Sequence, residues 1–261
     1  MAEPVALITG SARRIGAEIV RTLHANGMRV IIHYRNSAQE AHALADSLNS
    51  SRPDSAAIIQ ADLDKPDQVR QLAHDALACF GRMDLLVNNA SSFYPTPIDQ
   101  ADDADWDKLI HSNLRAPFVL TQAMAGQGLS PETDAAGEPR ASALIVNMID
   151  QRVRNLTPEC MSYTIAKMGL WAMTRTTAQA LAPAIRVNAI GPGPTLQGAQ
   201  QSAEAFAAQR AGTVLRRGAN PDDITAALGY FIDSPSVTGQ LLCTDGGEHL
   251  QWPAGPDDAG S

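Results

Sequence analysis

Short apolar runs alternate with segments of helical periodicity along almost the whole chain. The runs are apolar on both faces, which is typical of strands in a parallel sheet that helices cover on both sides. Because parallel neighbours need a crossover connection, the alternation predicts an α/β fold with a doubly wound parallel sheet of about seven strands. The expected strands are residues 5–9, 30–34, 57–60, 85–88, 143–148, 185–190 and 241–244.

The connecting segments predict helices within a single domain. Helices are expected at residues 15–26, 37–49, 66–80, 103–124 and 163–181. Gly27 and Gly81 directly follow two of them, at the position where glycine commonly ends a helix. No internal repeat or linker interrupts the pattern, so we expect one domain over residues 1–252. The polar segment 127–142 is expected to be an inserted loop, and residues 253–261 a flexible tail.

The composition excludes several classes of protein. With 44% apolar and 18% charged residues, the 261-residue chain can bury a full core. It has no apolar run of about 18 residues to span a membrane, and its first expected strand starts too close to Met1 for a signal peptide. The 3 cysteines and 6 histidines lack the spacing of a disulfide framework or metal site. A net charge of −8 without a basic stretch argues against nucleic acid, so we expect a cytoplasmic protein with a small-molecule partner.

A glycine turn joins the first expected strand to the first helix, at residues 9–16 with the sequence TGSARRIG. Gly10 permits a tight turn, and Gly16 permits close packing of helix and strand. Backbone N–H groups at the start of the helix would bind a pyrophosphate, as in Rossmann-type folds. Arg14 stands where glycine is usual and would place a cation beside the phosphates. The alternative is an ordinary strand–helix turn.

The segment after the second expected strand favours NADPH over NADH. An NAD-binding chain usually has an acidic residue here, whereas residues 33–37 read HYRNS. Arg35 and Ser37 could bind a 2′-phosphate, although Arg35 could instead be a solvated loop arginine. Asp62, after the third expected strand, faces the adenine or caps the next helix.

Three polar residues predict proton transfer. Tyr163 and Lys167 stand four positions apart, which places them on one face of a helix, and Asp150 precedes the tyrosine by thirteen positions. A lysine ammonium beside a phenol is expected to lower the pKa of the tyrosine, so that Tyr163 acts as an acid near neutral pH. Asp150 could accept a hydrogen bond from a ring nitrogen or share a proton with Tyr163. Its alternative role is a helix cap or surface turn.

The combined motifs resemble those of the short-chain dehydrogenase/reductase family. The resemblance covers nearly the whole chain and includes the glycine turn, residues 88–90 (NNA), Asn113, the Tyr163/Lys167 pair, Pro192-Gly193 and residues 245–247 (DGG). Within that family the chain looks most like the pteridine reductases. The signs are Arg14, the HYRNS segment, residues 88–97 (NNASSFYPTP) and an aspartate at position 150, where most relatives carry serine.

The resemblance implies a role for each matching residue. Asp150, Tyr163 and Lys167 would form the proton-delivery group, with Lys167 also binding the nicotinamide ribose. Asn113 would hold a water that links Lys167 to solvent, unless it is an asparagine at a helix kink. Phe93 would stack on the pterin opposite the nicotinamide, unless it belongs to the core. The residues expected to bind NADPH or NADP+ are Gly10, Arg14, Ile15, Gly16, His33, Tyr34, Arg35, Asn36, Ser37, Asp62, Leu63, Asn89, Ala90, Ser91, Tyr163, Lys167, Pro192 and Gly193. Those expected to bind substrate are Arg14, Ser91, Phe93, Asp150 and Tyr163.

Three functions are compatible with these residues. The first is an NADPH-dependent reductase of dihydropterins such as dihydrobiopterin, dihydromonapterin or a folate-like pterin. The second is a carbonyl or alcohol reductase for a ketone or 3-oxoacyl substrate, in which Asp150 is incidental. The third is a protein that senses NADPH without turnover, against which the intact Tyr163/Lys167 pair argues. The family resemblance also implies a homotetramer. Residues 194–212, where no pteridine-specific pattern is recognisable, are expected to form the substrate flap.

Overall fold

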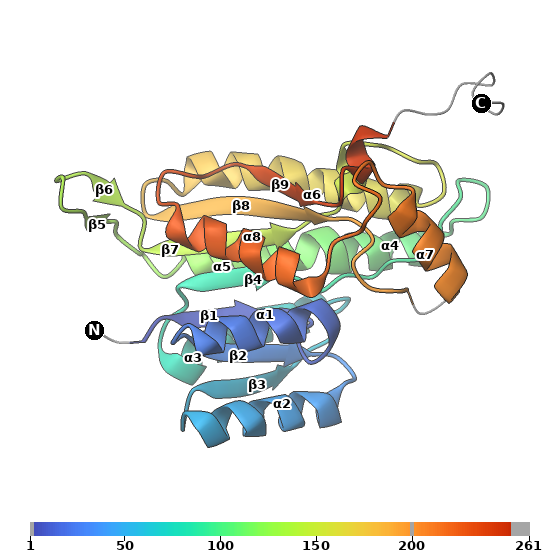
Figure 1. Cartoon of the computed structure of the whole chain (residues 1–261). Helices are drawn as coiled ribbons and strands as arrows, with labels where there is room; N and C mark the ends of the chain where they lie inside the picture. Colours follow the sequence, from blue (N-terminus) through green and yellow to red (C-terminus); the bar gives the residue numbers. More distant parts are fainter. Residues whose placement is uncertain (1–2, 199–200, 252–261) are drawn as a thin grey trace.

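Seven parallel strands form one sheet in the order β3-β2-β1-β4-β7-β8-β9 in the computed structural model, which describes residues 3–198 and 201–251 (Figure 1). Every pair of neighbours in this sheet is parallel, so the predicted doubly wound α/β fold is confirmed. The strands are β1 Val5–Ile8, β2 Arg29–Tyr34, β3 Ala56–Gln60, β4 Leu85–Asn88, β7 Ala143–Met148, β8 Ile185–Pro192 and β9 Leu241–Thr244.

Helices cover both faces of the sheet because each strand is apolar on both. In β1, Ala6 and Ile8 pack on one face with α1, α2 and α8, whereas Val5 and Leu7 pack on the other with α3, α5 and α6. The two layers are visible on either side of the sheet in Figure 1. The helices are α1 Arg14–Ala25, α2 Ala38–Ser51, α3 Pro66–Phe80, α4 Asp103–Ile110, α5 Ala116–Ala125, α6 Met161–Ala180, α7 Ala203–Ala211 and α8 Pro221–Asp233.

The long helix expected at residues 103–124 is interrupted. A π-helical turn, η1 His111–Arg115, separates α4 from α5. Two local features favour this interruption. Pro117 lacks an N–H for the helical ladder, and the Asn113 side chain donates to the carbonyl of Leu109 one turn earlier. Single π-helical turns of this kind often lie at functional sites.

Two further differences concern segments without strong periodicity. The expected loop at 127–142 contains a short hairpin, β5 Glu132–Thr133 paired with β6 Pro139–Arg140. Its turn is closed by Asp134, whose Oδ1 accepts from the N–H groups of Ala136 and Glu138. The helices α7 and α8 were not expected. A capping box between Asn220 and Asp223 begins α8, and this was a readable signal.

The carboxyl ends of the strands determine where a ligand can bind. The strand order reverses between β1 and β4, because β1 leads outward to β2 while β4 leads to β7. In open α/β sheets such a switch point leaves a crevice outside the strand ends. Among the described residues, no helix combines the length and apolar character needed to cross a membrane. The segment 253–261, predicted to be a tail, lies outside the described residues.

Candidate active site

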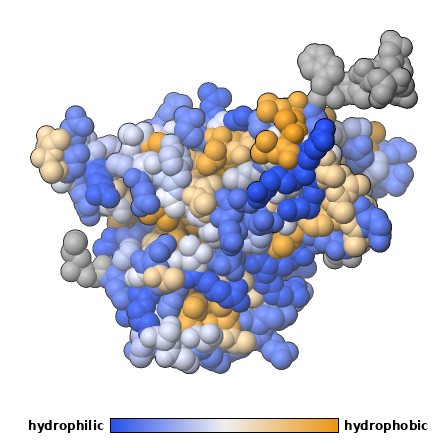
Figure 2. All heavy atoms as spheres, viewed as in Figure 1, coloured by the Kyte–Doolittle hydropathy of each residue, from blue (hydrophilic) through white to orange (hydrophobic). Residues whose placement is uncertain are grey.

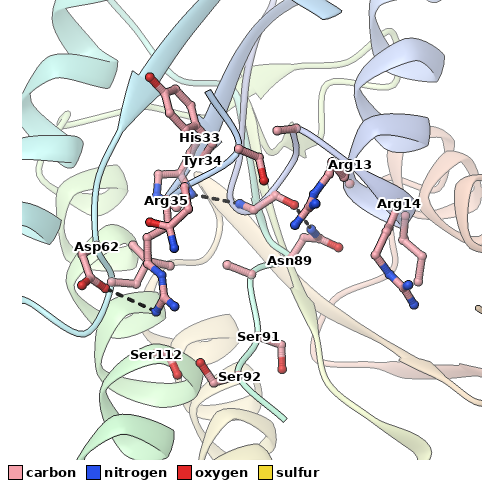
Figure 3. A pocket seen from close by; sticks show the side chains of 18 of the residues that line it. Arg13, Arg14, His33, Tyr34, Arg35, Asp62, Asn89, Ser91, Ser92 and Ser112 are labelled. Carbon is pink, nitrogen blue, oxygen red and sulfur yellow. Dashed lines mark hydrogen bonds and ion pairs between the residues drawn. The ribbon is translucent and has the colours of Figure 1, made fainter. Parts of the chain in front are cut away.

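A cavity of about 460 Å³ lies at the switch point, beyond the ends of β1, β2 and β4 (Figure 3). The structure brings together there fourteen residues that the sequence predicts to bind a dinucleotide. They are Gly10, Arg14, Ile15, Gly16, His33, Tyr34, Arg35, Asn36, Ser37, Asp62, Leu63, Asn89, Ala90 and Ser91. Ala12, Arg13, Asp64, Ser92 and Ser112 also line it. The other predicted cofactor residues, Tyr163, Lys167, Pro192 and Gly193, lie outside this lining.

The glycine turn has the shape of a cradle that side chains would fill. A Cβ on Gly10, which has a φ of +61°, would lie 2.9 Å from the Cα of Ala90. A Cβ on Gly16 would lie 2.6 Å from the carbonyl oxygen of Gly10. Asn89 closes the cradle, since its Nδ2 donates to the carbonyls of Thr9 and Gly10 at 2.8 and 3.1 Å. Close packing within the protein therefore requires glycine at both positions of this turn.

Arg14 adopts a conformation that favours glycine. Its φ of 55° is left-handed, which explains why glycine is usual at this position. Its Nη2 donates to the carbonyl oxygens of Leu196 and Gln197 at 3.2 and 2.9 Å, and Figure 3 shows the side chain extending away from the rest of the cavity. In this structure Arg14 therefore ties the glycine turn to the expected flap, and its contact with phosphate stays a prediction.

His33 supports the glycine turn from behind. Its Nδ1 accepts from the backbone N–H of Gly10 at 2.9 Å, and its Nε2 lies 3.1 Å from the carbonyl oxygen of Ala61. Because N–H groups only donate, Nδ1 is unprotonated and Nε2 carries the hydrogen, which makes the ring neutral. Burial lowers the pKa of His33 to about 4. The ring is 2% exposed, so it acts on a ligand through the turn that it supports.

This histidine predicts a pH-dependent loss of stability. Its pKa is about 4 in the folded chain and 6.5 when unperturbed, so its stabilising effect is complete above pH 6.5 and is lost as pH falls toward 4. The whole shift corresponds to about 3 kcal/mol. Urea unfolding of the wild type and of His33→Asn, which cannot titrate, should show a steeper decline between pH 6.5 and 4 for the wild type. Parallel declines in the two proteins would contradict the assignment.

Arg35 lies at the rim of the cavity between two carboxylates. Its Nη1 is 3.1 Å from Oδ2 of Asp64 and 3.7 Å from Oδ1 of Asp62. The capping alternative for Asp62 is wrong, because α3 begins after Lys65 and its first turn receives no side-chain cap. Oδ1 of Asp62 instead accepts from the N–H of Asp64 at 3.1 Å. The contact of Asp62 with adenine and that of Arg35 with a 2′-phosphate stay predictions.

Of the three proton-transfer residues, Asp150 follows the end of β7, and Tyr163 and Lys167 lie in α6. The Tyr163 hydroxyl donates to Oδ2 of Asp150 at 2.9 Å, while Oδ1 of Asp150 accepts from the N–H of Arg152 at 2.9 Å. Asp150 thus caps the short helix η2 Gln151–Val153 and contacts the tyrosine at the same time. Lys167 is 1% exposed, and its Nζ donates to the carbonyl of Met148 at 2.8 Å.

The expected lowering of the tyrosine pKa is wrong for this structure. Burial, and then the neighbouring Asp150 carboxylate, raise the pKa of Tyr163 well above its usual value. Asp150 is hydrogen-bonded to the phenol, whereas the ammonium of Lys167 lies 5.5 Å from the ring centroid. Burial also raises the pKa of Asp150 and lowers that of Lys167 to about 8. The phenol therefore holds its proton at neutral pH in this structure.

Asn113 anchors the segment that carries Ser91. The Oγ of Ser91 donates to Oδ1 of Asn113 at 2.7 Å, and Nδ2 of Asn113 donates to the carbonyls of Ser92 and Leu109 at 2.9 and 3.0 Å. The side chain is fully buried in the π-helical turn. This geometry favours the helix-kink interpretation, and the water relay stays a prediction.

Phe93 forms an exposed platform beside the tyrosine. Its ring is 53% exposed, so the alternative of a core residue is wrong. The Phe93 and Tyr163 rings meet edge to face with centroids 4.8 Å apart. Arg152, which the sequence reasoning missed, places its guanidinium 5.7 Å from the Phe93 centroid. Its position two residues after Asp150 was a signal that could have been used.

Pro192 and Gly193 end β8 against the carboxyl-terminal part of the chain. A Cβ on Gly193 would lie 2.7 Å from the Cα of Asp245, so this close approach requires glycine. Asp245 also belongs to a cluster that the sequence spacing did not reveal. In this cluster, Cys243, Asp245 and His249 each have an atom that could bind a metal, and these atoms lie within 4.8 Å of one another. Oδ2 of Asp245 accepts from Nδ1 of His249 at 2.6 Å, and Oδ1 accepts from the N–H of Gly247. The group is therefore an internal hydrogen-bonded unit.

A polar network connects the expected flap to this carboxyl-terminal part. Gln201 Nε2 donates to Gln209 Oε1 at 3.0 Å, and Gln209 Nε2 donates to Oε1 of Glu248 at 2.8 Å. Glu248 begins the helical turn η3 Glu248–Leu250. Figure 2 shows apolar side chains at the surface of this face of the molecule. Leu215 and Leu250, which flank this network in the sequence, are both exposed. Residues 199 and 200 of the flap lie outside the described residues.

Known proteins are similar to this chain over nearly its whole length. Residues 10–249 match the family described as Enoyl-(Acyl carrier protein) reductase. The chain is 34% identical to Pteridine reductase 1 of Leishmania tarentolae, over 95% of this chain and 96% of that protein. It is 29% identical to a 3-oxoacyl-(acyl-carrier-protein) reductase of Synechocystis sp., over 93% and 96%.

Two solved structures are similar over nearly the full length. FolM Alternative dihydrofolate reductase 1 from Brucella canis, complexed with NADP, has a TM-score of 0.89 at 42% identity, covering 99% of this chain and 98% of that chain. The FolM Alternative dihydrofolate reductase 1 from Brucella suis, also in complex with NADP, has a TM-score of 0.88 at 42% identity and covers 98% of each chain.

Proposed function

Because this chain belongs to the short-chain dehydrogenase/reductase family, we propose that it is an NADPH-dependent reductase of pterins. The resemblance to pteridine reductases inferred from the motifs is borne out by the matching relatives. The observation that carries the proposal is the hydrogen bond between Asp150 and Tyr163 beneath the exposed ring of Phe93. An acid pair beside an aromatic platform suits a flat heterocycle whose ring nitrogen must receive a proton.

The cavity at the switch point fits a dinucleotide. The pyrophosphate would lie at the glycine turn beside the first turn of α1, where free N–H groups favour anions. Arg35 would bind the 2′-phosphate, and Asp62 the adenine. Lys167 would bind the nicotinamide ribose, and Pro192-Gly193 the nicotinamide. When bound, NADPH would supply the hydride.

Proton delivery follows from the hydrogen bonds of the chain. Tyr163 would donate its proton to the ring nitrogen next to the reduced carbon. Asp150, once protonated from solvent, would return a proton to the phenolate along their 2.9 Å bond. Lys167, fixed by the Met148 carbonyl, would offset the negative charge left on the phenol. Ser91 and Phe93 would orient the pterin, with Asn113 supporting Ser91 and relaying protons from solvent through a water.

The second candidate is a reductase of ketones or 3-oxoacyl groups, which the similarity to the Synechocystis protein supports. The two candidates differ in their substrate requirement. Purified protein should oxidise NADPH with dihydrobiopterin, dihydromonapterin or dihydrofolate, and less efficiently with a panel of ketones. Turnover of ketones without turnover of any pterin would reverse the ranking. Tight NADPH binding without turnover of any substrate would favour a sensor.

NADPH should be preferred over NADH by tenfold or more. No acidic residue follows β2, and a charge-assisted contact with a 2′-phosphate contributes about 1.5–3 kcal/mol. The measurement is kcat/KM for each cofactor in the wild type and in Arg35→Asp, which should shrink the ratio. Arg21→Asp is the matched control, because Arg21 is exposed, pairs with Glu18 on α1 and lies outside the cavity lining. Equal efficiencies with both cofactors in the wild type would overturn this assignment.

We also propose that residues 1–252 act as a single NADP-binding domain in a cytoplasmic homotetramer. The continuous sheet supports the domain assignment, and the family resemblance supports the assembly. Light scattering of the purified chain tests the tetramer.

A further inference from the structure

Glu248 places a carboxylate at the edge of the proposed substrate site. It follows β9 in the turn η3, and this carboxyl-terminal part of the chain lies beside α7 in Figure 1. Oε1 accepts from Gln209 of α7 at 2.8 Å. Oε2 faces the end of β8, since a Cβ on Gly193 would lie 3.1 Å from it. The carboxylate therefore lies between the flap helix and the proposed nicotinamide end of the site.

Oε2 of Glu248 is the oxygen that a substrate could use. Among the described residues, the hydrogen bonds of this side chain involve Oε1 alone. The side chain is partly exposed, so Oε2 keeps a route to a ligand. A carboxylate oxygen with a free lone pair binds hydroxyl and N–H groups strongly.

The charges around Glu248 favour ligand groups that donate hydrogen bonds over ligand groups that are anionic. Burial and the carboxylates of Asp150 and Asp245 raise the pKa of Glu248, and Arg152 is the nearby cation that lowers it. Two other cations near the flap are engaged within the protein. Arg210 donates to the carbonyls of Pro194, Gly218 and Ala219 and to Asn220, and Arg14 donates to the carbonyls of Leu196 and Gln197.

The chemistry of the proposed reaction brings the pterin side chain to this place. In a 7,8-dihydropterin the carbon that accepts hydride also carries the side chain, and it adjoins the nitrogen that takes the proton from Tyr163. The first atoms of the side chain must therefore lie near Asp150 and Tyr163. The turn η3, which Glu248 begins, contacts η2, which Asp150 caps, so Glu248 lies near Asp150.

We propose that Glu248 is a specificity residue that accepts a hydrogen bond from the hydroxyl groups of a neutral, hydroxylated pterin side chain. This inference rests on the proposed pterin reductase function. The preferred substrates are pterins with hydroxyl groups on the first carbons of the side chain. Pterins with an aminobenzoyl side chain, as in dihydrofolate, lack those hydroxyls and bring carboxylates toward an acidic site.

The test compares 7,8-dihydrobiopterin, 6-methyl-7,8-dihydropterin and 7,8-dihydrofolate in the wild type and in Glu248→Gln. The glutamine keeps an oxygen for Gln209 but removes the charge. We expect kcat/KM for dihydrobiopterin to fall about tenfold, the difference between a charged and a neutral acceptor. The values for the methyl compound should stay within about twofold, and that for dihydrofolate should stay or rise.

Glu132→Gln provides the matched control, because Glu132 lies in the exposed hairpin strand β5, away from the proposed site, and should leave all three values unchanged. Equal losses on dihydrobiopterin and the methyl compound in Glu248→Gln would show a structural role in the flap and overturn the inference. If kcat/KM for each of the three substrates were the same in Glu248→Gln as in the wild type, the inference would be overturned as well. If the wild type reduced none of the three pterins, that result would instead overturn the proposed function itself.

Discussion

Tyr163→Phe is expected to lower pterin turnover by about two to four orders of magnitude, the range for losing a general acid. The substitution removes only the hydroxyl that donates to Asp150 at 2.9 Å. The ring and its edge contact with Phe93 remain. The affinity for NADPH should therefore be unchanged in a fluorescence titration, while stopped-flow or steady-state assays show the loss of turnover.

Lys167→Ala distinguishes the role of Lys167 from that of Tyr163, the proposed general acid. Lys167 is buried and donates to the carbonyl of Met148, and its proposed second contact is the nicotinamide ribose. Its removal should weaken NADPH binding as well as turnover, whereas Tyr163→Phe affects turnover alone. Wild-type turnover by Tyr163→Phe would show that another group donates the proton.

Asp150→Ser is expected to lower dihydropterin reduction about a hundredfold, within the range for losing one acid–base participant. The shorter serine removes the carboxyl group that accepts from the Tyr163 hydroxyl and that, once protonated, would return its proton. Its hydroxyl can still cap η2 as Oδ1 does, so the local backbone should be preserved. Initial rates with a dihydropterin and with an activated ketone should diverge, with any ketone activity surviving or rising.

Thermal unfolding distinguishes this effect from loss of structure. Asp150→Ser and the wild type should unfold at similar temperatures, because the cap persists. A similar loss of activity on both substrates would show that Asp150 serves the general acid machinery and does not select pterins.

Features that depend on local backbone requirements could be predicted from the sequence. The cradle needs glycine at positions 10 and 16 because Ala90 and Gly10 approach so closely. The strand ends then place His33 and Asn89 around this cradle, and this arrangement is what the motif predicts.

Features that depend on contacts between distant segments could not be predicted. The left-handed Arg14 reaches the flap, which lies 183 residues away in the sequence, and no spacing in the sequence records that contact. The direction in which the pKa of Tyr163 shifts depends on burial and on which charged group lies nearer. The spacing of residues on a helix does not decide either factor. Glu248 joins the site only because β9 lies next to β8.

The central claim is that this chain reduces pterins with the Asp150–Tyr163 pair as the proton source. A competition assay tests it most directly, with limiting NADPH, 7,8-dihydrobiopterin and an activated ketone at equal concentration in one tube. The ratio of the two products then equals the ratio of the two kcat/KM values. We predict that the wild type forms mainly tetrahydrobiopterin. With Asp150→Ser, the ratio of tetrahydrobiopterin to alcohol should fall about a hundredfold. Alcohol as the main product of the wild type, with dihydrobiopterin unchanged, would contradict it.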